Sequence, residues 1–177
     1  MGAPMSVRTH PTPPAHRTAD TQAPYAWAAG RLCLGWIFAW AFLDKLLGLG
    51  KPATSGWLDG TSPSKGFLSH VEGPFKGMFH SMAGQTWVDV SYMFGLAGLG
   101  VALLLGIGLR IAAAGGTILL AMLYAASLPL ETNPFMDEHW IYAALLIAVA
   151  WANAGDTLGL GGPWSRIGLV RRFPALR

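Results

Sequence analysis

Four long apolar stretches, almost free of charge, constrain this chain more than any other feature. They cover residues 27–43, 90–109, 111–130 and 140–155, and the first contains Arg31 as its one charged residue. A helix that crosses a bilayer needs about 20 apolar residues, whereas apolar runs of roughly 10–14 are more typical of soluble cores. Only 12% of all residues are charged, against about 25% in an average soluble domain. The pattern predicts an all-α fold, an integral membrane four-helix bundle.

The expected domain boundaries follow from these stretches. The predicted transmembrane domain is 25–177, with helices at about 26–47, 87–107, 110–128 and 138–155 and an outer loop at 48–86. Residues 1–24 are rich in proline and have no apolar run, which favours a disordered cytoplasmic tail. The outer loop contains four apolar residues at the i, i+3, i+4, i+7 spacing of a short helix with one apolar face: Phe75, Met78, Phe79 and Met82. Such a helix either lies in the headgroup layer or caps the bundle from outside.

Small residues mark the second and third predicted helices. They are Gly95, Gly98, Ala102 and Gly106 on the second helix, and Ala112, Gly115 and Gly116 on the third. Small residues let helix backbones approach closely within lipid. We therefore expect a structural role for these residues, with the packing of the bundle depending on the glycine faces of the two helices.

The positions of the basic residues predict the orientation in the membrane. Apart from Arg31, every arginine lies before the first helix, between the second and third, or after the fourth, while every lysine lies at or after the end of the first helix. By the positive-inside rule both termini are cytoplasmic. Nucleic-acid binding is not indicated, because it requires a basic stripe on a polar surface.

Ionisable residues within spans are costly and mark function or specific packing. Arg31 lies about one turn inside the cytoplasmic end of the first helix. Its guanidinium either extends to the inner headgroups or pairs with Asp156. Asp44 and Lys45 lie near the outer end of the same helix, where the helix either reaches water or contributes to a polar site.

The stretch NPFMDEHWIY places Glu138, His139 and Tyr142 on one face at the outer start of the fourth helix. We predict a quinone headgroup site there, because such a ring needs stacking partners and its oxygens need proton donors and acceptors. The predicted quinone-binding residues are Trp40, Asp44, Lys45, Glu138, His139 and Tyr142. The alternative is an aromatic belt with an interfacial polar network. No metal site or covalent cofactor is indicated, and the single Cys33 excludes a dithiol pair within this chain.

Several segments together resemble the DoxX/DoxD-like membrane proteins: RLCLGWIFAWAFLDKL, GPFKGMF, WVDVSYMFGLAGLGVALLLGIGLRIAAAGG and NPFMDEHWIYA. The resemblance covers about residues 27–177 and implies a four-helix bundle in a bacterial plasma membrane. Some members of that family are subunits of a thiosulfate:quinone oxidoreductase, and others are linked to redox homeostasis. The resemblance assigns no catalytic residue.

The expected function is that of a quinone-linked redox subunit, which as a thiosulfate dehydrogenase (quinone) component would need a soluble or membrane partner subunit. Carboxylates outnumber lysines on the predicted outer side, so a partner would have to attract a dianionic substrate. The alternative is a non-catalytic membrane scaffold that docks a soluble redox or stress-defence enzyme. A transporter is disfavoured by the absence of broken helices and repeats. Contact with membrane lipid is expected, and a homo-oligomer is left open.

Overall fold

The regular secondary structure of the described residues is entirely helical. The structure, a computed structural model, describes residues 17–131 and 133–177, with side chains from residue 22 onward. The elements in these ranges are α-helices and short 3₁₀ turns, without a strand. The predicted all-α class is therefore confirmed, whereas residues 1–16 of the predicted tail lie outside the described residues.

Four helices form the body of the molecule: α1 (Arg17–Leu47), α4 (Thr86–Leu105), α5 (Leu109–Ala126) and α6 (Glu138–Trp151). Of these, α4, α5 and the segment Gln22–Leu47 of α1 are long and apolar enough to cross a membrane. Helix α6 has 14 residues, or roughly 21 Å at about 1.5 Å per residue. It is thus shorter than the predicted 138–155, because the chain leaves helical geometry at Asn153, whose φ is +48°.

Helix α1 also differs from its expected bounds. It begins at Arg17 and contains Pro24, so residues 17–24 are helical although we placed them in the tail. A proline inside a helix removes one backbone hydrogen bond. Here it does not end the helix.

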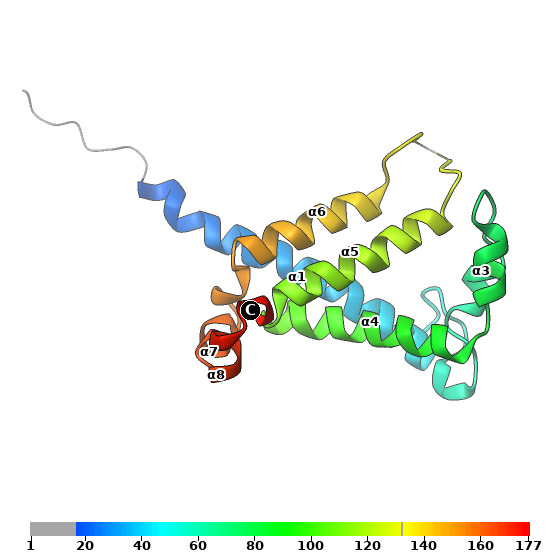
Figure 1. The fold of residues 1–177 in the computed structure, drawn as a ribbon, viewed down its shortest axis with the longest axis horizontal. Coiled ribbons are helices and arrows are strands. Elements are labelled where there is room, and N and C mark those ends of the chain that lie inside the picture. Colours follow the sequence, from blue (N-terminus) through cyan, green and yellow to red (C-terminus); the bar gives the residue numbers. More distant parts are fainter. Residues whose placement is uncertain (1–16, 132) are drawn as a thin grey trace, which may run out of the picture.

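The four helices share one apolar core. Helix α1 packs along α4 and α5 packs along α6. The most deeply buried core residues come from all four helices: Leu34, Phe38, Met93, Leu96, Leu103, Leu120, Leu146 and Val149. In Figure 1, α4 and α5 meet near the turn that joins them and separate toward the end where α3 lies.

Helices α1 and α4 approach each other closely at two glycines. A Cβ atom added to Gly100 would lie 2.9 Å from the Cα of Ala39 on α1, and one added to Gly35 would lie 3.0 Å from the backbone nitrogen of Leu104. By contrast, a Cβ atom at Gly98 or Gly115 would meet no atom within 4 Å. The expected packing role therefore holds at Gly106 and Gly116, where an added Cβ atom would lie 2.7 Å from Gly155 and 2.6 Å from Leu146, but not at Gly98 and Gly115.

One end of the molecule, which we call the loop end, consists of residues 48–85, 127–131 and 133–137. It contains the turn η1 (Trp57–Asp59) and the short helices α2 (Lys65–Leu68) and α3 (Lys76–Met82). Phe79 of α3 is buried against Leu68, Val71, Val88 and Ala126, and Met82 packs beside it. Helix α3 therefore caps the helices, while Phe75 and Met78 on the same predicted face stay exposed.

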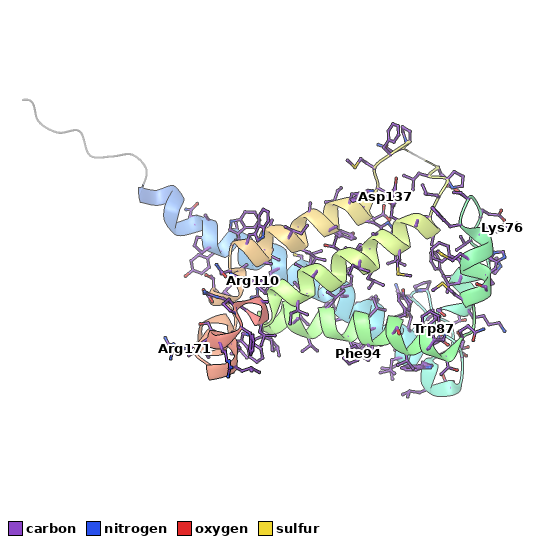
Figure 2. The ribbon with its side chains drawn as sticks, in the orientation of Figure 1. Lys76, Trp87, Phe94, Arg110, Asp137 and Arg171 are labelled. Atoms are coloured by element: carbon purple, nitrogen blue, oxygen red, sulfur yellow. The ribbon has the colours of Figure 1, made fainter. Side chains whose placement is uncertain are left out.

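The opposite end, which we call the C-terminal end, consists of residues 106–108 and 152–177. It contains η2 (Ala154–Asp156), α7 (Gly161–Ser165), α8 (Gly168–Arg172) and η3 (Pro174–Leu176). Figure 2 shows Arg110 and Arg171 at this end, and Lys76 and Asp137 at the loop end. The described arginines of 110–177 thus gather at one end of the helices, and the lysines lie toward the other.

Candidate functional site

Arg31 is fully buried and bonds to backbone carbonyls at the C-terminal end. Its guanidinium donates to Leu103 O, Leu104 O, Ala154 O, Thr157 O and Leu158 O. Asp156 pairs instead with Arg177, at 2.7 Å from Nη2 to Oδ2. Both interpretations that we drew from the sequence, extension to the headgroups and a pair with Asp156, are therefore wrong.

These bonds complete the C-terminus of α4. The last four carbonyls of a helix have no partner within it. Ala102 O accepts from the backbone nitrogens of Gly106 and Ile107, and Leu105 O accepts from that of Leu160 at 2.8 Å. The two carbonyls between them, those of Leu103 and Leu104, are the ones that Arg31 binds. A cation at this position also opposes the partial negative charge of the helix end.

Three glycines allow the chain to close around the guanidinium. A Cβ atom at Gly106 or Gly159 would lie 3.2 Å from an Arg31 nitrogen, and one at Gly155 would overlap the carbonyl of Gly106. Gly106 also needs its positive φ of 72° to end α4, a conformation that glycine adopts without steric cost. Arg31 is therefore a structural residue and not a candidate ligand-binding group.

Asp44, at the other end of α1, is also fully buried. Its Oδ1 accepts from the backbone nitrogen of Lys51 at 2.8 Å, and its Oδ2 accepts from that of Ala53 at 2.9 Å. The carboxylate thus holds the loop that follows α1. These two hydrogen bonds to the loop, and not contact with water, account for a charged group at the end of α1.

Asp89 is a second buried carboxylate, which we did not include among the predicted site residues. It lies on α4, and its Oδ1 accepts from both the backbone nitrogen and the hydroxyl of Ser64, and from the hydroxyl of Ser62 at 2.8 Å. It thereby holds the segment before α2 against α4. That segment forms part of the walls of the two cavities described next.

A cavity of about 590 Å³ lies at the loop end, and we call it the polar cavity because several polar side chains stand among the apolar groups that line it. It brings together the end of α1, the loop after it, α4, α5 and the start of α6. Its lining includes Lys45, Ser55, Thr61, Ser62, Phe67, Tyr92, Leu123, Ser127 and His139. Lys45 and His139 are the two predicted site residues on this list.

Lys45 reaches over the ring of Tyr92. Its ammonium nitrogen lies 5.9 Å from the ring centroid, within the range of a cation–π interaction. Tyr92 is the third residue of the apolar run 90–109, and its phenol hydroxyl near the end of a predicted span is the sequence signal that could have placed it in the site. The cavity therefore has a cation beside an aromatic wall.

His139 is held by Asp137. The carboxylate of Asp137 accepts from the backbone nitrogen of His139 at 3.0 Å and lies 2.7 Å from its Nδ1. Glu138, which we predicted as a quinone-binding residue next to His139, is exposed, and among the described residues no hydrogen bond joins it to His139. Asp137 could have been recognised as the helix N-cap, because aspartate directly before an apolar helix commonly fills that position.

The remaining predicted residues lie apart from the cavity. Trp40 is half-buried beside Trp36, with ring centroids 5.9 Å apart. Tyr142 is partly buried against the apolar core. Neither residue lines the polar cavity, nor do Asp44 and Glu138. The structure thus brings together two of the six predicted residues in one space.

A second, apolar cavity of about 280 Å³ lies between α4 and α5, under α2 and α3. It is lined by Phe67, Leu68, Phe79, Met82, Trp87, Tyr92, Gly95, Gly115, Ile118, Met122 and Leu123, among others. Small-molecule sites are mostly apolar with a few placed polar groups. The two cavities together have this character.

No family model, no curated protein and no solved structure matches this chain. The resemblance to the DoxX/DoxD-like proteins therefore stays an expectation from the sequence. What the site can do is inferred below from its residues and cavities alone.

Proposed function

We propose that the chain is a DoxX/DoxD-like integral membrane protein and acts as a quinone-linked redox subunit. In this proposal α6 is the fourth span of a four-helix bundle in a bacterial plasma membrane, and both termini are cytoplasmic. The observation that supports the function best is the polar cavity, where Lys45 of α1 and His139 of α6 lie beside Tyr92 of α4. It is large enough for a ring headgroup, since small-molecule sites span about 300–1,000 Å³.

The residues present fit the chemistry of a quinone headgroup. Bound quinone would accept two electrons and two protons. Lys45 would donate a hydrogen bond to one ring oxygen, and His139 would bond to another through Nε2, which has no hydrogen-bond partner among the described residues. Phe67 and Tyr92 supply aromatic walls to the cavity.

In this proposal Asp137 fixes the orientation of the His139 ring and keeps a hydrogen on Nδ1. A carboxylate that accepts from Nδ1–H fixes the ring orientation and leaves Nε2 free to accept a proton or, when the ring is charged, to donate one. This arrangement is a carboxylate–histidine pair at the start of a helix. It would let the chain hold and pass a proton at Nε2 while the ring stays in place.

A partner subunit belongs to this proposal. If the donor is thiosulfate, its oxidation would take place on that partner, and only electrons would reach the cavity. The exposed charges of the loop end nearly balance, with Asp59, Glu72 and Glu131 against Lys51, Lys65 and Lys76, so this surface would not attract a dianion by itself. The partner would have to supply that attraction.

The proposed orientation predicts a labelling pattern. Ser69 and Ala175 are exposed at opposite ends of the molecule, and Cys33 is the single cysteine of the chain. In a Cys33→Ala background, Ser69→Cys should react with a membrane-impermeant thiol reagent on intact cells, and Ala175→Cys should react only after the cells are opened. The reverse pattern would place the polar cavity on the cytoplasmic side.

The proposed quinone headgroup site in the polar cavity, which we call the head site, predicts the effect of His139→Leu. This change keeps most of the volume and removes both ring nitrogens, so retention of bound quinone should fall by about 5- to 150-fold, the equivalent of about 1–3 kcal/mol for one hydrogen bond to a buried ligand. Quinone extracted from the purified protein, measured by mass spectrometry, checks this, with the melting temperature in detergent recorded alongside.

Two neighbours provide the controls for that variant. Glu138→Gln alters the adjacent exposed carboxylate and should leave retention unchanged. Asp137→Asn keeps an oxygen for the helix cap but loses the charge beside Nδ1, and should give an intermediate loss. Wild-type protein that carries no quinone but co-purifies with a soluble redox enzyme would instead favour the non-catalytic scaffold.

A further inference from the structure

The apolar cavity adjoins the polar one. Phe67 of α2, Tyr92 of α4 and Leu123 of α5 line both spaces. One side of this shared wall has Lys45 and His139, and the other side has almost only hydrocarbon. A ligand that crosses the wall would need a polar part and an apolar part.

The apolar cavity exists because α4 and α5 diverge. Figure 1 shows the two helices separating toward the loop end. Gly95 and Gly115 line the gap, and a Cβ atom at Gly115 would meet no atom within 4 Å. Small residues thus leave space here that larger side chains would fill.

The cavity also has an apolar rim at the surface. Trp87, Ile118 and Met122 line it and are 61%, 65% and 42% exposed. In a helix pair that crosses a bilayer such side chains face lipid, so the gap between α4 and α5 opens toward the hydrocarbon layer. A molecule dissolved in the bilayer could enter sideways.

We propose that the apolar cavity holds the hydrocarbon tail of the same molecule whose ring occupies the polar cavity. The ligand class is a single-chain amphiphile, a ring headgroup with an isoprenoid or alkyl tail that enters from lipid between α4 and α5. A volume of about 280 Å³ is at the lower end for a ligand site, which suits one chain and not two. The inference rests on the proposed head site.

The test fills the cavity without disturbing the helices. Gly115→Leu places a side chain into the gap, and Gly98→Leu is its matched control on α4, because a Cβ atom there also meets no atom within 4 Å and Gly98 lines neither cavity. Each purified variant is titrated in detergent with two probes, a benzoquinone with a decyl tail and the same benzoquinone without it. Binding is read as quenching of tryptophan fluorescence.

We expect Gly115→Leu to bind the decyl quinone about 5- to 150-fold more weakly than wild type, since the leucine and the tail would compete for one space. Affinity for the tail-free quinone should not change, and Gly98→Leu should match wild type with both probes. If Gly115→Leu binds each probe with the same affinity as wild type, the tail site is wrong and the head site is still supported. If wild type binds neither probe, both proposals fail.

A second measurement uses the wild-type protein alone and so does not depend on how the variant folds. A decyl benzoquinone with a photoreactive diazirine at the end of its tail is bound and irradiated, and the labelled peptides are identified by mass spectrometry. Labels on α4 and α5 around Trp87, Ile118 and Met122 support the proposal. Labels confined to the segment 48–64 would overturn it.

Discussion

Arg31→Met is expected to unfold the C-terminal end of the molecule and to lower the free energy of unfolding by on the order of 3–5 kcal/mol or more. Several buried carbonyls would lose their partner at once, and each buried group left unpaired costs about 1–3 kcal/mol. Because Arg31 is fully buried, water could not replace the lost donor unless this end of the molecule opened. The measurement is the melting temperature in detergent, together with the fraction of protein that elutes as a single species.

Arg31→Lys should recover only part of this loss. An ammonium has three donors on a compact head, whereas the planar guanidinium has five donors that point in fixed directions. The guanidinium reaches α4 on one side and the chain after α6 on the other, and one ammonium cannot serve both.

Arg171→Met is the matched control for these variants. Arg171 is exposed at the same end of the molecule, and its loss should shift the melting temperature little. Equal melting of Arg31→Met and Arg171→Met would contradict the structural role and favour a guanidinium that extends to the headgroups.

Gly100→Leu is expected to be the second most damaging change. A Cβ atom at this position would already lie 2.9 Å from both the nitrogen and the Cα of Ala39. The backbone of α1 cannot move aside as a flexible side chain would, so α1 and α4 must separate along their shared face. Overpacking of this kind typically costs about 1–3 kcal/mol and sometimes more.

Gly98→Leu provides the comparison, because it lies two residues away on the same helix and faces open space. Thermal melting of the two variants in one detergent should show a large decrease for position 100 and little change for position 98. A pair of variants that melt alike would mean that α1 and α4 do not approach as closely as described.

The sequence by itself determined the helical class and the positions of the main helices. Long runs without charge leave few alternatives, since a buried backbone must satisfy its own hydrogen bonds and a helix does so within one segment. The sequence also predicted that α6 begins at Glu138 and that Phe79 lies on the apolar face of a short helix. Lys45 and His139 could be selected because ionisable residues at the ends of apolar helices are few.

The partners of these ionisable residues were decided only by the tertiary structure. Arg31 and Asp44 bond to backbone groups, and every residue has a carbonyl, so no sequence pattern marks which ones an arginine will reach. We considered side-chain partners such as Asp156, which the structure gives to Arg177. Glu138 was preferred to Asp137 because helical spacing describes faces within a helix and says nothing of the cap before it.

The two cavities could not be predicted from the sequence either. Glycines on α4 and α5 are compatible with close helix contact or with open space. Their spacing in the sequence does not distinguish these two outcomes. Gly100 meets the backbone of α1, whereas Gly115 faces a gap. The difference depends on the angle at which α5 leaves α4, and that angle is set by how all four helices and the loop-end cap pack at the same time.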